Sequence, residues 1–235
     1  MATAERRTTR PKISYPTSDG RPMAETDLHR NLMVEQIETL KMHKAGDRRF
    51  YVSGNLLVFY EPGNRRKHVA PDFFAVRGVP NHPRDHYLIW LEGKAPEVVI
   101  EYTSKTTRKE DQRTKFVLYR DTLKVKELFL FDPFGDYLEP QFQGYRLRGD
   151  QYVRIRPVES RLPSQVLGLH LEAHGIQLRF HDPSTGYWLP TPDEARRQAD
   201  AARQQAEADK QQIEAENERL RLELEELRRR LPPQP

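Results

Sequence analysis

The chain has 235 residues, which suits one folded domain with an appendage better than two full domains. Hydrophobic residues make up 36% and charged residues 31% of the sequence, and cysteine is absent, which excludes a disulfide framework and a thiolate metal site. The net charge is +4, but residues 193–231 hold nine basic and eleven acidic residues, so the remainder carries +6. A mildly basic domain is compatible with contact to a phosphate backbone, although an ordinary solvated surface explains the same charge.

The N-terminal sequence predicts neither export nor membrane insertion. The first ten residues are polar and include Arg6, Arg7 and Arg10, and no apolar segment follows them, so a signal peptide is not expected. The longest apolar runs, such as Val98-Val99-Ile100, are too short to span a bilayer. Together with the absence of cysteine, these features predict a cytoplasmic protein that makes no membrane contact.

The first half of the chain predicts one helix followed by short strands. Residues 1–22 contain several proline and glycine residues that break regular structure, and they are expected to form a flexible lead. The segment from residue 25 to about 44 predicts a helix because apolar side chains recur on one face: Leu28, Leu32, Ile37 and Leu40. Apolar and aromatic runs then predict strands at 50–52, 56–60, 73–76 and 87–91.

The middle of the chain has the pattern of a β–α–β unit. Residues 97–102 have a continuous apolar centre, which is typical of a strand buried on both faces. A helix is expected from about Thr107 to Arg120, where Thr107 and Glu110 have the spacing of a capping box. Residues 128–131 predict the next buried strand, and residues 145–152 and 177–181 predict peripheral strands. We therefore expect an α/β domain over residues 23–190.

A helical tail is predicted for residues 191–231, with a disordered end at 232–235. Residues 193–231 contain no glycine or proline. Apolar residues are spaced by seven at Ile213, Leu220 and Leu227, and a second series of the same spacing contains Asn217, Leu224 and Leu231. The first series occupies d positions and the second a positions of a coiled coil. Only about three heptads fit well, and a lone charged helix is the alternative. Residues 213–231 thus predict a homodimer or another coiled-coil partner.

Two carboxylates stand where apolar strands are expected. Glu101 interrupts a buried strand, where a charged group is costly unless it is paired or binds a metal. Asp72 begins another apolar strand, directly after Pro71. If those strands are neighbours, the two carboxylates can converge, and two convergent carboxylates form a hard-oxygen site suited to Mg²⁺. The alternative is a strand-entry residue at Asp72 and a solvent-facing residue at Glu101.

Lys115 is the candidate cation for this site. It belongs to the helix that follows the Glu101 strand, and it shares a face of that helix with Asp111 and Tyr119. A helix crossing back over the sheet would direct this face at the carboxylates, where the lysine could stabilise a charged transition state. A surface ion pair between Asp111 and Lys115 is the alternative.

Several ordered segments resemble the Uma family of restriction endonuclease-like proteins. The segments that carry the resemblance are residues 23–30, 52–55, 70–72, 95–104, 110–119 and 128–133, within a region of roughly 15–190. The resemblance implies the PD-(D/E)XK restriction-endonuclease-like fold, in which helices flank a central mixed sheet. It also implies hydrolysis of DNA phosphodiester bonds with Mg²⁺, or with Mn²⁺ in its place.

The resemblance assigns roles to individual residues. Pro71-Asp72 matches the PD element, and Glu101 matches the second acid of the motif. The resemblance therefore implies that Asp72 and Glu101 are metal ligands. The standard lysine two positions later is replaced by Thr103, and the family pattern points instead to Lys115. Two other lysines compete for that role, Lys105 and Lys109. A catalytically inactive nuclease fold that serves as a DNA-binding or assembly module is therefore the alternative function.

Three further features are candidates for a role at or near this site. The resemblance implies that Glu25 is an additional acid that helps to hold the metal. A favourable charge at the N-terminus of the helix explains a glutamate at this position equally well. His29, one helical turn later, is expected to be a satisfied polar side chain. A basic turn of Arg65, Arg66 and Lys67 precedes the Asp72 strand and is a candidate for phosphate contact, with a solvated turn as the alternative.

Overall fold

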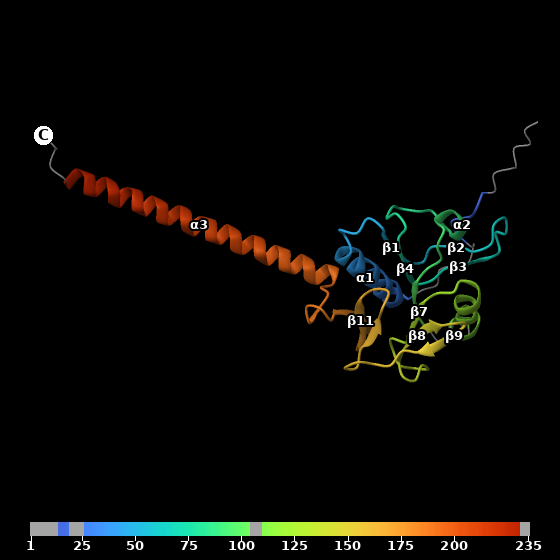
Figure 1. Ribbon diagram of the computed structural model, residues 1–235. Helices are drawn as coiled ribbons and strands as arrows, with labels where there is room; N and C mark the ends of the chain where they lie inside the picture. Colours follow the sequence, from blue (N-terminus) through green and yellow to red (C-terminus); the bar gives the residue numbers. More distant parts are fainter. Residues whose placement is uncertain (1–13, 19–25, 104–109, 231–235) are drawn as a thin grey trace, which may run out of the picture. The chain divides into compact units, whose positions relative to one another are not determined.

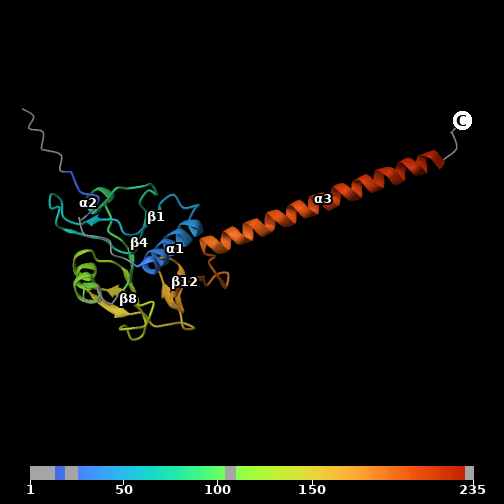
Figure 2. The same cartoon turned by 180° about the vertical axis from the view of Figure 1, so that it is seen from behind.

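The computed structural model describes residues 14–18, 26–103 and 110–230, without the side chains of residues 110–112. The chain divides into two compact units, Met1–Leu189 and Pro190–Pro235. The first unit is a mixed α/β domain, and the second contains one long helix (Figures 1 and 2). Among the described residues, no helix combines the length and the apolar character needed to cross a membrane.

A six-stranded sheet forms the centre of the domain. Its strands lie in the order β1 (Phe50–Ser53), β4 (Phe73–Arg77), β6 (Val98–Tyr102), β7 (Glu127–Phe131), β8 (Phe142–Arg148) and β9 (Gln151–Arg154). Strands β6 and β7 are parallel, and every other neighbouring pair is antiparallel. The parallel pair and the helical connection between its strands confirm the predicted β–α–β unit.

One face of this sheet is covered by the first helix and a second sheet. Helix α1 (Asp27–His43) begins after Thr26, whose hydroxyl accepts a hydrogen bond from the His29 amide at 3.2 Å. The second sheet has the order β10 (Leu162–Ser164), β11 (Leu169–His174), β12 (Gln177–Asp182) and β13 (Tyr187–Trp188). Apolar side chains of α1, such as Leu40, pack with Phe180 of β12 and Ile100 of β6 in one buried cluster.

The opposite face is covered by the connection between β6 and β7. This connection contains two π-helical segments, η1 (Glu110–Lys115) and η2 (Leu118–Thr122). Tyr119 of η2 is fully buried and packs in one cluster with Val99 and Leu128 of the central sheet. A small sheet of β3 (His68–Val69), β2 (Val58–Phe59) and β5 (Tyr87–Leu88) adds Val58, Val69 and Tyr87 to this cluster. Helical layers on both faces of a mixed sheet confirm the predicted fold class.

Some sequence-based boundaries differ from the structure. The strand predicted at 87–91 is limited to β5, because the chain turns at once into the short helix α2 (Ile89–Glu92), which ends at left-handed Gly93. The strand predicted at 145–152 is the hairpin of β8 and β9. Tyr15, in the segment predicted as a flexible lead, packs its ring 5.0 Å from that of Phe59 and accepts a hydrogen bond from the Gly63 amide. The aromatic contact attaches this part of the lead to the domain.

The second unit is the helix α3 (Pro192–Arg230). Its N-terminus is a reciprocal capping box, in which the Glu194 amide donates to the Thr191 hydroxyl at 3.2 Å and the Thr191 amide donates to the Glu194 carboxylate at 2.9 Å. No side chain of α3 is buried. The predicted tail is therefore helical over nearly its whole length.

Candidate active site

The two predicted acids lie at the same end of two neighbouring strands. Strands β4 and β6 are antiparallel, with Phe73 opposite Ile100. Asp72 directly precedes β4, and Glu101 directly follows Ile100 in β6, so both acids lie at the same end of this strand pair. The Tyr102 amide donates to Asp72 Oδ2, so the Asp72 carboxylate lies against the residue that follows Glu101. The pairing of these strands meets the condition under which the two carboxylates were predicted to converge.

Glu101 is completely buried, and both of its carboxylate oxygens have partners. Lys115 donates from Nζ to Oε2 at 2.8 Å, and the Tyr119 hydroxyl donates to Oε1. A buried carboxylate without such partners would lose several kcal/mol of solvation, on the order of the penalties seen for buried ions in proteins. The Lys115 ammonium and the Tyr119 hydroxyl therefore offset the cost of burying a charged Glu101 inside the sheet.

The helical connection brings both partners to Glu101. Lys115 ends η1, and Tyr119 follows four residues later in η2. Side chains four positions apart lie on the same side of a helical segment, so both can face the sheet. A π-helical turn is wider than an α-helical one. The hydrogen bond from the Leu123 amide to the Leu118 carbonyl spans five residues and shows this wider turn. Segments of this kind are frequent at functional sites.

Asp72 is held by a different set of groups. Its Oδ2 accepts a hydrogen bond from the Tyr102 amide at 2.8 Å, and His29 Nε2 lies 3.3 Å from the same oxygen. Burial alone would raise the pKa of Asp72. The contact with His29, the charge of Lys115 and the hydrogen bond from the Tyr102 amide outweigh burial and lower that pKa. Asp72 therefore carries its negative charge at neutral pH.

His29 has a closer relation to the site than the sequence predicts. It was expected to be a polar side chain satisfied within its surroundings, yet α1 places it against Asp72, and its ring lies 5.8 Å from that of Tyr102. The first turn of α1 thus meets the end of the strand pair that carries the two acids. The contact joins residues 43 positions apart, which no local sequence pattern reveals.

Gly54 and Asn55 fix the backbone at Asp72. A Cβ atom added at Gly54 would collide with the backbone carbonyl of Asp72 and would come within 2.7 Å of Ile37 Cδ1. Asn55 adopts a left-handed conformation with φ of 49° and donates its amide to the Pro71 carbonyl at 2.8 Å. Gly54 and Asn55 therefore hold the segment that presents Asp72, because a side chain at position 54 would push this segment away.

Thr103, at the position of the standard lysine, contributes to the sheet instead. It is 3% exposed, and its amide donates to the Phe131 carbonyl of β7 at 2.8 Å. Its hydroxyl approaches the same carbonyl at 3.4 Å. Lys115 is the lysine that contacts Glu101, whereas Lys105, Lys109 and Glu25 lie outside the described residues. Within the described part of the chain, no group of three His, Asp or Glu side chains gathers as a preformed metal site.

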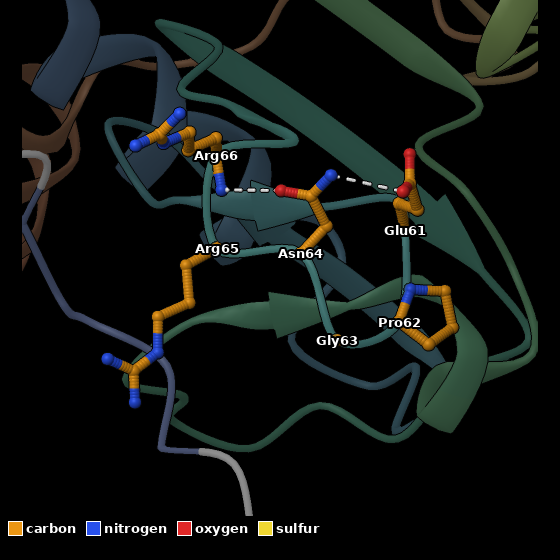
Figure 3. A pocket seen from close by; sticks show the side chains of 6 residues that line it. All are labelled: Glu61, Pro62, Gly63, Asn64, Arg65 and Arg66. Carbon is orange, nitrogen blue, oxygen red and sulfur yellow. Dashed lines mark hydrogen bonds between the residues drawn. The ribbon is translucent and has the colours of Figure 1, made fainter.

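The basic turn is a separate feature of the surface. Residues 61–66 surround a shallow hollow, and Asn64 orders it by donating to Glu61 at 3.0 Å and accepting from the Arg66 amide at 3.1 Å (Figure 3). Figure 3 shows the guanidinium groups of Arg65 and Arg66 extending away from one another. Both arginines and Lys67 are exposed. Three cations on one turn are therefore free to meet an external anion.

Comparisons with known proteins identify the family of the chain. Residues 3–165 match the family described as "Uma2: Putative restriction endonuclease". Among solved structures, the chain is similar to a nuclease of DUF820 from Anabaena variabilis, described as putative, with 18% identity and a TM-score of 0.46. That similarity covers 65% of this chain and 81% of the other. A search of curated proteins found no significant match. Because the family match extends over more than half of its length, this chain belongs to the Uma2 family of restriction endonuclease-like proteins.

Proposed function

We propose that this protein is a Mg²⁺-dependent endonuclease that hydrolyses DNA phosphodiester bonds. The observation that carries the proposal is the neighbouring placement of Asp72 and Glu101, with the Lys115 ammonium 2.8 Å from the Glu101 carboxylate. Two acids and one lysine at a strand end combine the ligands of a hard cation with a group that stabilises negative charge. Membership in a family described as restriction endonucleases supports DNA as the substrate.

The donor set fits Mg²⁺, with Mn²⁺ as a substitute. Asp72 and Glu101 would hold the ion through carboxylate oxygens, which are the ligands that Mg²⁺ prefers. Mg²⁺ commonly binds through one or two carboxylates and completes its shell with water and substrate phosphate, so a third protein carboxylate is not required. When bound, the ion supplies Lewis acidity at the phosphoryl oxygen and lowers the pKa of a water ligand.

The residues around the two acids have distinct tasks in this proposal. Lys115 stabilises the negative charge that develops on the phosphoryl oxygens, because its ammonium is held at the acids by η1. Tyr119 orients Glu101 through its hydroxyl. His29 and the Tyr102 amide keep Asp72 ionised and fix its orientation. The basic turn of Arg65, Arg66 and Lys67 contacts backbone phosphates outside the reacting centre.

The test is cleavage of supercoiled plasmid and of single-stranded DNA in Mg²⁺ or Mn²⁺. The variants Asp72→Asn, Glu101→Gln and Lys115→Ala are each expected to lose at least about 100-fold in rate, a typical cost of losing one charge-stabilising group. Glu97→Gln is the matched control, because Glu97 is also a buried, ion-paired acid but lies at the other end of β6. Equal cleavage by the wild type and the three site variants would overturn the proposal.

A catalytically inactive DNA-binding module is the second candidate. It is favoured by the engagement of both Glu101 oxygens and by the threonine at the position of the standard lysine. In that case the protein binds DNA without cutting it, and affinity falls as salt rises. Replacing Arg65 and Arg66 by alanine would then reduce the slope of log affinity against log salt by about two, one for each phosphate that an arginine no longer neutralises. Binding without cleavage in every metal tested would select this candidate.

A further inference from the structure

Helix α3 carries an apolar stripe that is exposed along its second half. Ile213, Leu220, Leu224 and Leu227 have 59%, 44%, 56% and 51% of their surface exposed. These residues follow the seven-residue spacing of d and a positions, and they lie on one side of the helix. An apolar stripe on an otherwise charged helix is the pattern of a surface that packs against another helix.

We propose that the partner is a second copy of this chain, paired in parallel and in register through residues 213–230. Asn217 occupies an a position between the leucines. In a parallel, in-register pair it meets the same residue of the other copy, and the two side-chain amides can hydrogen-bond to each other. An asparagine at such a position specifies register and strand number.

The charges beside the stripe complement each other in this arrangement. In a parallel coiled coil, a g residue of one helix faces the e residue five positions later in the other. Here Glu216 and Glu223 occupy g positions, and they face Arg221 and Arg228 at e positions. Both copies supply both pairs, so the dimer contains four attractive contacts. Among the described residues, Glu216, Glu223 and Arg228 have no ion-pair partner within their own helix.

An antiparallel pair is disfavoured by Asn217 rather than by the number of attractive charge contacts. Reversing one helix places e positions opposite e positions and g positions opposite g positions. Near the centre of such a pair, Arg221 would face its own copy, and so would Glu223. Farther from the centre, Glu214 would face Arg228 and Glu216 would face Arg230, which are attractive pairs. Asn217 would face an apolar d residue and leave its amide without a partner. Upstream, Asp209 at g would face Glu214 at e in the parallel pair, so the favourable charge pattern begins only near residue 213.

The first experiment measures the mass of the whole chain by light scattering over a range of concentrations. A dimer is expected for the wild type, and a monomer is expected for the double variant Leu220→Glu and Leu227→Glu. Leu222→Glu is the matched control, because Leu222 is 59% exposed at an f position, off the stripe. Circular dichroism confirms that each variant remains folded. A monomeric wild type, or a double variant with unchanged mass, would overturn the proposal.

The second experiment determines the orientation of the pair. Because the native chain contains no cysteine, any disulfide must join introduced residues. Ile213→Cys is expected to form a disulfide with its own copy on mild oxidation, because parallel d positions face each other. In an antiparallel pair the two thiols would lie near opposite ends of the paired segment, too far apart to react. Leu222→Cys, which points away from the partner, is expected not to cross-link. A dimer in which Ile213→Cys does not cross-link contradicts parallel pairing. None of these readouts depends on nuclease activity.

Discussion

The ammonium of Lys115 lies 2.8 Å from the carboxylate of Glu101, although fourteen residues separate them in the chain. The carboxylate is fully buried, and 16% of the lysine side chain is exposed. Separating the two charges would be costly, because the Glu101 carboxylate cannot reach water without leaving the sheet. This ion pair links the architecture of the central sheet to the chemistry proposed for the site.

Replacing Lys115 by methionine is expected to destabilise the metal-free protein by about 3–5 kcal/mol, because Glu101 is left buried and uncompensated. The double variant Glu101→Gln with Lys115→Met is expected to regain most of that loss, since neither buried charge remains. Both variants should lack cleavage activity. Urea unfolding monitored by circular dichroism measures the stabilities. A double variant as unstable as Lys115→Met alone would contradict the uncompensated-charge explanation.

Tyr119→Phe removes the hydroxyl that donates to Glu101 and leaves the ring in place. Hydrogen bonds to charged groups contribute about 1.5–3 kcal/mol, and a loss of that size is expected in the free energy of unfolding. The same change in the background of Glu101→Gln should cost clearly less, because the acceptor is then neutral. Equal costs in both backgrounds, measured by a double-mutant cycle, would show that the hydroxyl does not act through the Glu101 charge.

Gly54→Ala is expected to lower stability by at least about 1–3 kcal/mol, because the added methyl group meets the backbone of Asp72 rather than a flexible side chain. Displacement of Asp72 should also reduce cleavage. Gly46→Ala is the control, since an added Cβ there meets nothing within 4 Å. Thermal unfolding and plasmid cleavage should distinguish the two substitutions. If Gly54→Ala behaves like Gly46→Ala, the close approach at Asp72 is not a constraint.

The lowered pKa of Glu97 predicts that the stability of the fold depends on pH in a specific way. Burial raises its pKa, but hydrogen bonds from Lys126 and from the Arg77 amide, together with their charges, outweigh burial and lower it. A lowered pKa stabilises the folded state above the ordinary glutamate range, and that contribution disappears as pH falls through the lowered value. Glu97→Gln should therefore cost about 1–2 kcal/mol at neutral pH and nothing at low pH. A cost independent of pH, in urea titrations, would exclude this charge effect.

The sequence predicted those parts of the structure that depend on local patterns. The apolar centre of residues 97–102 indicated a buried strand, and the charged, glycine-free run after Pro192 indicated a long helix. The position of Glu101 within an apolar run also marked it as a residue with a special environment. Periodicity and burial patterns determine such features because they involve neighbours along the chain.

Tertiary structure alone decided which residues meet. The pairing of β4 with β6 brings Asp72 and Glu101 to the same end of two neighbouring strands, and the packing of η1 and η2 on the sheet brings Tyr119 as well as Lys115 to the Glu101 carboxylate. His29 reaches Asp72 only because α1 packs across the sheet. These contacts result from strand register and packing between layers, which are set by the whole core rather than by local spacing. The sequence by itself therefore indicated the two acids and the lysine as candidates, and the fold determined which groups contact them.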